Sequence, residues 1–277
     1  GESGCGKTTL GRLILRLIEP TGGDVEFDGQ PIQNLSHKEM RLMRRRMQII
    51  FQDPMSSLNP RLTVASTLTE PMAVHGIGKS KDERIERAAQ ALANVGLERE
   101  HLWRYPHEFS GGQRQRISIA RALAVDPEFI VCDEPTSALD VSVQAQILNL
   151  LRDLQIKLGL SYLFITHNIS VVSYLAEQVA VMYLGRIVEK GSVDQVLNQP
   201  RHPYTQALLE AVPELHQGEP PAQELILEGE IPSAINPPQG CYFHQRCPRV
   251  MDKCRQQYPQ SIQFDGHQVS CFLYQPD

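Results

Sequence analysis

The chain has 277 residues, of which 41% are hydrophobic and 21% are charged, and its formal net charge is −5 at pH 7. This length can form one large domain with a sizeable core and a smaller second one. The acidic balance gives no general attraction to polyanions, so nucleic acid is not an expected partner, and the run 44–46 of three arginines is interpreted as a solvated face. Apolar runs such as residues 179–184 have strand length and fall well short of the ~18 to 20 residues that cross a bilayer.

The first residues form a glycine-rich phosphate-binding motif, Gly-Glu-Ser-Gly-Cys-Gly-Lys-Thr, that fills G-x-x-x-x-G-K-[ST] at every defined position. Apolar residues then recur at helical spacing up to the turn at 20–23, so the loop is expected to open onto a helix. Backbone N–H groups would hold a triphosphate, Lys7 would add charge at the terminal phosphates and Thr8 would offer a hydroxyl to Mg²⁺. The loop residues predicted to bind the nucleotide are Gly1, Glu2, Ser3, Gly4, Cys5, Gly6, Lys7, Thr8 and Thr9.

The next segments predict a small β region followed by helices. Residues 25–27 alternate in polarity before Asp28-Gly29 and read as a hairpin, and residues 47–51 read as a buried strand that ends at Gln52. Residues 58–105 look helical and amphipathic, so a helical subdomain is expected between the two phosphate elements. Gln52 could report the presence of Mg²⁺ and the attacking water, or it could be an ordinary surface glutamine. The sequence leaves both interpretations open.

A second phosphate-binding element, Ser110-Gly111-Gly112-Gln113, stands at the start of a helix predicted over 113–124. An apolar strand over 129–132, a helix from 142 to about 157 and a second apolar strand over 162–167 follow it. Strand, helix, strand is typical of a parallel sheet covered by helices.

Both of these predicted strands end in polar residues with an expected role. Asp133, at the end of the first, is the expected second protein group at the metal. Glu134, one residue on, is well placed to polarise the attacking water. His167 ends the second strand, where a side chain would face a γ-phosphate, and we favour this role over that of a structural histidine.

In this order the motifs resemble the ATP-binding subunits of ABC transporters. The matching segments are Gly1 to Thr8 (Walker A), Gln52 (Q-loop), Ser110 to Gln113 (signature), Phe129 to Glu134 (Walker B), Ser137 to Asp140 (D-loop) and His167 (switch histidine). The phrases at 51–60 and 201–205, with a cysteine-bearing tail, resemble the dipeptide and oligopeptide importer branch, which also includes nickel importers.

The resemblance implies an α/β P-loop NTPase cassette with a RecA-like parallel sheet, a partial antiparallel β subdomain and a helical subdomain over about 58–125. It implies an ATP-binding domain over 1–216, followed by a linker and a small Cys-rich extension over 217–277. It also places the strand that feeds the phosphate loop, and the aromatic residue that stacks on adenine, upstream of Gly1. We therefore expect further native sequence before this residue.

The resemblance further implies a head-to-tail dimer, in which each ATP lies between the Walker A motif of one subunit and the signature of the other. On this ground Asp140 is added to the predicted nucleotide-binding residues, and Gln52 is added to Thr8 and Asp133 as a predicted ligand of Mg²⁺. The implied partners are a second ATP-binding subunit, identical or paralogous, two transmembrane permease subunits and an extracytoplasmic peptide-binding protein. Such a subunit lies on the cytoplasmic face of the bacterial inner membrane, and the segment after Gln52 receives the permease's coupling helix.

Four of the six cysteines, Cys241, Cys247, Cys254 and Cys271, lie in the last forty residues, separated by five, six and sixteen residues. Cytosolic thiols stay reduced, so a thiolate-bound metal is favoured over disulfides. Structural zinc usually uses closer pairs, whereas a [4Fe–4S] cluster tolerates wide spacing, and Cys247-Pro248 is similar to the Cys-Pro of bacterial ferredoxins. The tail also resembles cluster-binding tails of the importer branch. The sequence thus favours a [4Fe–4S] cluster, with Zn²⁺ and unligated thiols as the alternatives.

The function indicated is that of an ATPase subunit that energises peptide import. Import of nickel or another small solute is one alternative, because cargo is chosen mainly by other subunits. A soluble ABC ATPase that acts on nucleic acid or ribosomes is the other. Proteins of that class tend to carry two cassettes, long coiled-coil insertions or basic surfaces, and this sequence contains none of them.

Overall fold

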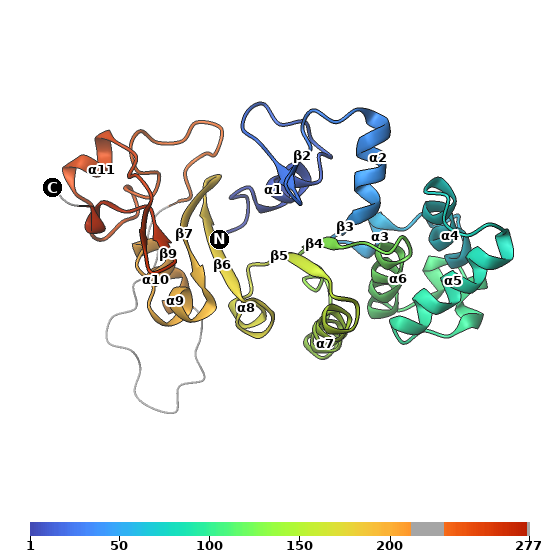
Figure 1. Ribbon diagram of the computed structural model, residues 1–277. Helices are drawn as coiled ribbons and strands as arrows, with labels where there is room; N and C mark the ends of the chain where they lie inside the picture. The colour runs from blue at the N-terminus through green and yellow to red at the C-terminus, as the bar shows by residue number, and fades with distance from the viewer. Residues whose placement is uncertain (212–229, 276–277) are drawn as a thin grey trace. The chain divides into compact units, whose positions relative to one another are not determined.

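The computed structural model describes residues 1–211 and 230–275, and the chain divides into two compact units (Figure 1). One unit is residues 8–165, and the other combines residues 1–7 with residues 166–277. Within the described residues, no helix has both the length and the apolar character that a membrane span needs.

The unit of residues 8–165 contains a parallel sheet, a hairpin and a group of helices. Its elements are α1 (Lys7–Ile14, which begins one residue earlier), β1 (Glu26–Phe27), β2 (Gln30–Pro31), α2 (His37–Arg46), β3 (Met47–Ile50), α3 (Pro54–Ser57), α4 (Val64–Val74), α5 (Lys81–Asn94), η1 (Arg99–Trp103), η2 (Pro106–Glu108), α6 (Gly111–Leu123), β4 (Phe129–Asp133), α7 (Val141–Leu158) and β5 (Ser161–Ile165).

The parallel sheet has the order β3-β4-β5 and is buried on both faces. Because neighbouring side chains of a strand point to opposite faces, Val131 packs with Ile165 in one core, whereas Ile130 and Cys132 belong to another. Gly11 of α1 lies against Val131 and Ile165. Helices α6 and α7 contribute to the second core (Figure 1). The predicted strand, helix, strand unit is therefore confirmed as β4, α7 and β5, with continuous apolar strands as expected of a sheet covered on both faces.

The predicted hairpin and helical region are also present. Asp28 and Gly29 both have positive φ, 54° and 73°, as two-residue hairpin turns require, and they join β1 to β2. The helical region is divided into α4, α5, η1 and η2, and its buried residues, such as Leu68 and Leu92, share a core with Ile117 of α6.

The interpretation of the arginine run as a solvated face is wrong for two of its three members. Arg46 pairs with Glu128 at 2.6 Å and with Asp28 at 2.8 Å, and Arg44 donates to the Arg16 carbonyl oxygen at 2.7 Å. Both side chains are half-buried and hold α2 to neighbouring segments. A run of three charges predicts solvation only where no carboxylate or carbonyl from elsewhere in the fold is near.

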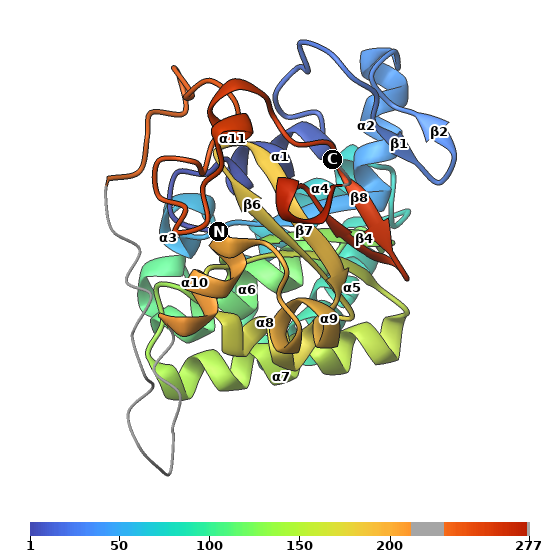
Figure 2. The same cartoon turned by 90° about the vertical axis from the view of Figure 1, so that its left-hand side faces the viewer.

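The other unit contains a four-stranded antiparallel sheet in the order β6-β7-β9-β8 (Figure 2). Its elements are α8 (Ile169–Leu175), β6 (Gln178–Tyr183), β7 (Arg186–Ser192), α9 (Val193–Asn198), α10 (Pro203–Glu210), α11 (Asp252–Gln256), β8 (Ile262–Phe264), β9 (His267–Val269) and η3 (Phe272–Tyr274). The register Glu189↔Val269 places β9 beside β7.

The cysteine-bearing segment shares a core with this sheet. Phe243, which is 1% exposed, packs with Tyr183 and Tyr204, with ring centroids 5.4 Å from each. The predicted domain boundary at 216/217 lies outside the described residues, as does most of the predicted linker. The division into 1–216 and 217–277 therefore stays a prediction.

Candidate nucleotide-binding site

The predicted phosphate loop is held by contacts within its own compact unit. The backbone N–H of Gly185, in the turn between β6 and β7, donates to the Cys5 carbonyl oxygen at 2.8 Å. Gly4 and Gly6 have φ of 77° and 103°, which residues with a side chain rarely adopt. Turns of this kind align successive backbone N–H groups into a concave anion site. The glycine positions of the motif are thus explained by the backbone they must form.

The Lys7 ammonium folds back over the first residues of the loop. Its Nζ donates to the carbonyl oxygens of Gly1 and Glu2 at 2.8 and 2.9 Å, and it lies 3.7 Å from the Cys5 sulfur. The position of this charge is therefore linked to the backbone of Glu2. The role of Lys7 at the terminal phosphates stays a prediction.

Thr8 and Asp133 are brought together although 125 residues separate them in the chain. The Thr8 hydroxyl donates to Asp133 Oδ1 at 3.0 Å. Asp133 is the last residue of β4 and is 3% exposed. Two oxygen donors at this spacing, one of them a carboxylate, are suited to Mg²⁺, which prefers oxygen ligands and keeps several of its own waters. The residues present therefore fit the predicted metal.

Gln52 and Glu134 form a second side-chain pair. It lies next to the first pair because Glu134 directly follows Asp133 in the chain. Gln52 Nε2 donates to Glu134 Oε2 at 3.0 Å, and the Glu134 backbone N–H donates to the Ile165 carbonyl oxygen at 2.9 Å. Glu134 has φ of 46°, a left-handed conformation that costs free energy for a residue other than glycine. Strain of this kind persists where the surrounding structure holds a side chain in a required place, and the exposed Gln52 side chain contacts that of Glu134. The role of Gln52 at the metal and the water stays a prediction.

The second glycine turn begins α6 with a reciprocal cap. The Ser110 hydroxyl accepts from the Gln113 backbone N–H at 3.3 Å, and Gln113 Oε1 accepts from the Ser110 backbone N–H at 3.0 Å. Ser110 itself is exposed. The start of this 13-residue helix is thus ordered by its own side chains, and the positive end of its dipole lies at the exposed Ser110.

Gly112 of the same turn has a packing role that the motif does not reveal. A Cβ at this position would stand 2.5 Å from Cγ1 of Val143, in the first turn of α7. Asp140 caps α7, since its Oδ1 accepts from the Val143 backbone N–H and the Ser142 hydroxyl, both at 3.0 Å. The signature turn and the predicted D-loop residue are therefore joined through the start of α7.

His167 lies beyond the strand that was expected to contain it. Strand β5 ends at Ile165, and the chain turns because the Asn168 backbone N–H donates to the Thr166 hydroxyl at 3.0 Å. Asn168 then caps α8. His167 is exposed in this turn, so the predicted strand end was two residues too late. Its role at the γ-phosphate stays a prediction.

The four tail cysteines lie close enough for the charges of Cys247, Cys254 and Cys271 to act on Cys241, and Cys254 and Cys271 are buried whereas Cys241 and Cys247 are half-buried. The pKa of Cys241 is raised to about 12 and that of Cys271 to about 11, mainly by burial and in smaller part by the charge of neighbouring cysteines. Each sulfur also receives a backbone N–H, from Phe243, Arg249, Met251 and Leu273 in chain order. No set of three or more His, Cys, Asp or Glu side chains placed to hold a metal ion occurs in residues 1–211 and 230–275.

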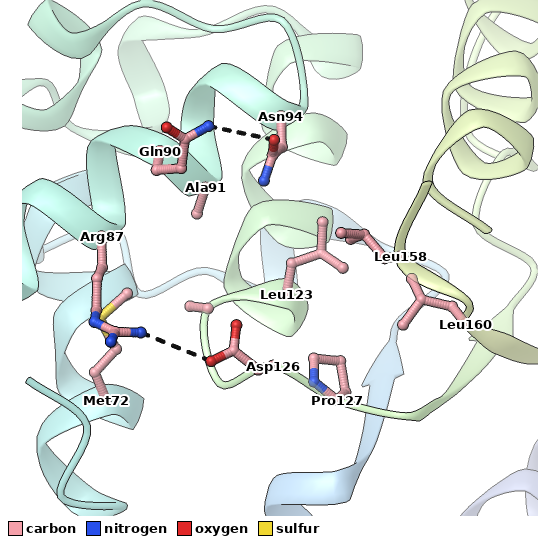
Figure 3. A pocket seen from close by; sticks show the side chains of 11 residues that line it. Met72, Arg87, Gln90, Ala91, Asn94, Leu123, Asp126, Pro127, Leu158 and Leu160 are labelled. Carbon is pink, nitrogen blue, oxygen red and sulfur yellow. Dashed lines mark hydrogen bonds and ion pairs between the residues drawn. The ribbon is translucent and has the colours of Figure 1, made fainter. Parts of the chain in front are cut away.

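A cavity of about 250 Å³ lies among α4, α5, α6 and the end of α7, away from all predicted nucleotide residues. Figure 3 shows Arg87 and Asp126 at this cavity, 3.8 Å apart, with Met72, Leu123 and Leu160 among its lining residues. Its lining combines apolar side chains with the polar Arg87, Gln90, Asn94 and Asp126, and none of the predicted nucleotide-binding residues belongs to it.

Glu2 is the centre of a cluster that sequence reasoning missed. Its carboxylate accepts from Arg246 Nη1 and Nη2 at 2.8 and 3.1 Å, and its backbone N–H donates to the Tyr204 hydroxyl at 2.9 Å. Tyr204 lies in the segment 201–205 and Arg246 directly precedes Cys247, and both segments carry the resemblance to the peptide importer branch. Nothing in their spacing indicates a contact with the phosphate loop.

Two family models match the chain. Residues 1–137 match the model for "ABC transporter", and residues 188–254 match "Oligopeptide/dipeptide transporter, C-terminal region". The second range includes Tyr204 and Arg246.

Curated relatives match along nearly the entire chain. The dipeptide transport ATP-binding protein DppF of Escherichia coli is 52% identical over 277 residues, which cover 100% of this chain and 82% of that protein. The oligopeptide transport ATP-binding protein AppF of Bacillus subtilis is 49% identical, covering 99% and 84%.

Solved structures match the fold. The dimeric structure of MJ0796, a bacterial ABC transporter cassette, superimposes with a TM-score of 0.62 at 34% identity, covering 70% of this chain and 83% of that one. The structure of cbiO1 from Clostridium perfringens, part of an ABC transporter complex, gives a TM-score of 0.64 at 31% identity, covering 72% and 77%.

Proposed function

Because this chain belongs to the family of ATP-binding subunits of ABC peptide transporters, we propose that it hydrolyses ATP to drive the import of di- or oligopeptides across a membrane. The observation that carries this function is the joining of two side-chain pairs, Thr8 with Asp133 and Gln52 with Glu134, at the end of one buried strand. Peptide cargo is supported by the names of the relatives and by the match of the C-terminal region.

Thr8 and Asp133 would hold the magnesium ion, with Gln52 as a further oxygen ligand. The metal would neutralise charge on the β- and γ-phosphates. Asp133 is suited to this task because its carboxylate is almost fully buried, where a nearby cation is strongly stabilising. The phosphate loop, residues 1–7, would contribute backbone N–H groups and the Lys7 charge to the same nucleotide.

Glu134 would accept the hydrogen bond of the attacking water and so orient its oxygen toward the γ-phosphate. Gln52 holds the Glu134 carboxylate at 3.0 Å, so movement of the segment after Gln52 changes the orientation of Glu134. His167 would complete the site at the γ-phosphate. Hydrolysis would in this way respond to whatever protein binds next to the Q-loop.

The signature turn supports a second cassette as partner. Ser110 is exposed at the start of α6, and the N-terminus of this helix would cap the γ-phosphate of an ATP held by the phosphate loop of that partner. The dimeric structure of MJ0796 supports a second cassette as partner. The partner would be a second copy or a paralogue, ATP binding would close the pair, and the chain alone would be a poor ATPase.

A groove beside the Q-loop supports contact with a permease. Its lining residues come from the segment after Gln52, α4 and α6, and they include Ser57, Leu62, Glu70 and Arg121. Arg121 donates to the Ser57 carbonyl oxygen, which fixes one wall. We place the coupling helix of a permease here. Two permease subunits and an extracytoplasmic peptide-binding protein would complete the transporter, with this chain on the cytoplasmic face of the bacterial inner membrane.

The two alternative functions receive less support. The relatives DppF and AppF are named for dipeptide and oligopeptide transport, which favours peptides over nickel. The net charge of −5 disfavours an ATPase that acts on nucleic acid or ribosomes.

We also propose that the four tail thiols ligate a metal centre. Supporting this, each sulfur accepts a backbone N–H, as sulfurs of iron–sulfur sites do, and neighbouring thiolates would repel one another unless a cation lies between them. A [4Fe–4S] cluster suits four thiolates without a close pair in the sequence, and Zn²⁺ is the alternative. The centre is structural in this proposal.

The proposed function is tested with the complete transporter purified from membranes and reconstituted in liposomes. ATP hydrolysis should be stimulated by a peptide together with the binding protein, and labelled peptide should accumulate only when ATP is present on the cassette side. Stimulation by DNA or ribosomes, or ATP-driven uptake of Ni²⁺ but not of peptide, would replace the function with the corresponding alternative.

A further inference from the structure

The phosphate-loop residue Glu2 is fixed at two points by one region of the chain. Arg246 holds its carboxylate with both terminal nitrogens, and the Tyr204 hydroxyl holds its backbone N–H. The Arg246 side chain is 4% exposed and that of Glu2 is 22% exposed, so water competes little for this ion pair. A two-pronged guanidinium contact sets both the distance and the orientation of the carboxylate.

Both holding residues are themselves anchored in the core of their unit. Tyr204 is fully buried and stacks edge-on with Tyr183, with ring centroids 4.7 Å apart. Arg246 follows the buried Phe243 in a turn in which the Arg246 backbone N–H donates to the Phe243 carbonyl oxygen at 3.0 Å. Since Phe243 packs on Tyr204, the two contacts to Glu2 start from one aromatic cluster.

The segment that carries Tyr204 is fixed from β7. The Glu189 carboxylate is fully buried and accepts the backbone N–H groups of Arg201 and His202 at 2.7 and 3.1 Å, and it lies 2.7 Å from Nε2 of His267. A buried carboxylate with three such polar partners has its hydrogen-bonding capacity met, and moving it away from them would cost free energy. Tyr204 therefore has little freedom to move away from Glu2.

Glu2 in turn links this region to the predicted phosphate ligand Lys7. The Glu2 carbonyl oxygen accepts from Lys7 Nζ at 2.9 Å, while the N–H and the carboxylate of the same residue are held by Tyr204 and Arg246. Every polar group of Glu2 thus has a hydrogen-bond partner. A shift of the Glu2 backbone would move its carbonyl oxygen, which accepts from the Lys7 ammonium.

We propose that Arg246 and Tyr204 are positioning residues for the phosphate loop, so that the C-terminal peptide-transporter region sets the affinity of this subunit for MgATP. The inference rests on the proposed ATPase function. It gives the region over 188–254 a task at the nucleotide, in addition to any contact that it makes with other proteins.

The test uses the full-length subunit in its purified transporter, with ATP and Mg²⁺ as the probe. Arg246→Gln should raise the KM for ATP about tenfold with kcat changed less than about twofold, because the loss is in binding before the chemical step. Tyr204→Phe, which keeps the buried ring and removes only the hydroxyl, should raise KM by a smaller factor. Arg246→Lys keeps the charge but not the two-pronged contact and should be intermediate.

A double-mutant comparison separates positioning from general loss of structure. Glu2→Gln should raise KM like Arg246→Gln, and the double variant should be no worse than either single one, because the two side chains act as one pair. Arg255→Gln, an exposed arginine on the same segment, is the matched control and should match the wild type. The inference is overturned if KM is unchanged in Arg246→Gln and Tyr204→Phe, or if Arg255→Gln has the same effect. A wild-type complex that does not hydrolyse ATP would instead refute the proposed function.

Discussion

The Gln52 amide donates to the Glu134 carboxylate at 3.0 Å, which joins two motifs that lie 82 residues apart in the chain. Glu134 holds a left-handed backbone conformation at this point, and Asp133 before it accepts from the Thr8 hydroxyl. Glu134, assigned to the water, and Asp133, one of the residues assigned to the metal, are therefore neighbours at the end of one strand. Each can be tested separately.

Replacing Glu134 by Gln removes the charge that orients the attacking water and keeps the shape of the side chain. ATP binding should persist, whereas steady hydrolysis should fall by about a hundredfold or more. Binding is measured with a fluorescent ATP analogue and turnover by phosphate release from the intact transporter. Asp153→Asn, an exposed carboxylate of α7, is the control. Turnover at the wild-type rate in the Glu134 variant would refute the assigned role.

Replacing Gly112 by Ala tests the packing of the signature turn on α7. The new methyl group would overlap Val143, so the variant should lose ~1–3 kcal/mol in the free energy of unfolding. The double variant with Val143→Ala should recover most of this loss, because it removes the overlapping atom. Denaturant unfolding measures the change in the free energy of unfolding for the single and the double variant. Gly22→Ala is the control, since a Cβ there meets no atom within 4 Å. A loss that Val143→Ala leaves unchanged would mean that the glycine is needed for another reason.

The tail thiols should carry iron when the protein is purified without oxygen. We expect broad visible absorption and about four iron atoms per chain for a [4Fe–4S] cluster. Cys247→Ser and Cys271→Ser should lose both, whereas Cys132→Ala, a buried thiol of the parallel sheet, should retain them. Colourless wild-type protein with one zinc per chain would select the alternative metal. Protein that binds neither metal would show that these thiols are unligated.

Protonation of His202 should destabilise the protein in acid. Burial lowers the pKa of this side chain from 6.5 to about 3, and its Nδ1 accepts from the Tyr204 backbone N–H at 3.1 Å, so the folded state needs the neutral ring. Since the folded pKa lies below the unfolded one, this contribution to stability is complete above pH 6.5 and is lost as the pH falls toward 3. The contribution of His202 to the free energy of unfolding changes by at most about 1.4 kcal/mol per pH unit.

His202→Asn, which keeps an acceptor near the same N–H, should lose part of this acid sensitivity. Denaturant unfolding of wild type and variant at pH 7 and pH 5 gives the difference, and the exposed His37→Asn is the control. Equal pH dependence in wild type and in the His202 variant would contradict the assignment.

The parallel core could be predicted from the sequence because its signals are local. Residues 129–132 are continuously apolar before the acidic Asp133, and this pattern occurs where helices cover both faces of a strand. The phosphate motif led to the expectation that Thr8 and Asp133 meet at a metal, whereas the contact between Gln52 and Glu134 was not predicted. The end of β5 was misjudged because Tyr162 to His167 lacks a turn signal, and the break depends on a hydrogen bond between Asn168 and Thr166.

The contacts of the C-terminal region could not be predicted. Strands β8 and β9 have three residues each, too few to show periodicity, and they are recognised only by pairing, β9 with β7 and β8 with β9. The ion pair between Glu2 and Arg246 spans 244 residues, and no pattern in a single sequence relates two such positions. The tail was expected to bind a metal because it contains four of the six cysteines. Its packing was not predicted, and Phe243 lies in one core with residues of β6 and α10.

The pairing of β9 with β7 has a consequence for how the chain can be shortened. In the intact chain β9 covers backbone N–H and C=O groups of β7, through the pairs of Glu189 with Val269 and Lys190 with Gln268. A protein cut before Ile262 would leave that side of β7 open, and an uncovered edge strand recruits strands from other molecules. Such a truncation should form aggregates through β7 even while the parallel sheet of the other unit remains folded, so the last residues also protect solubility.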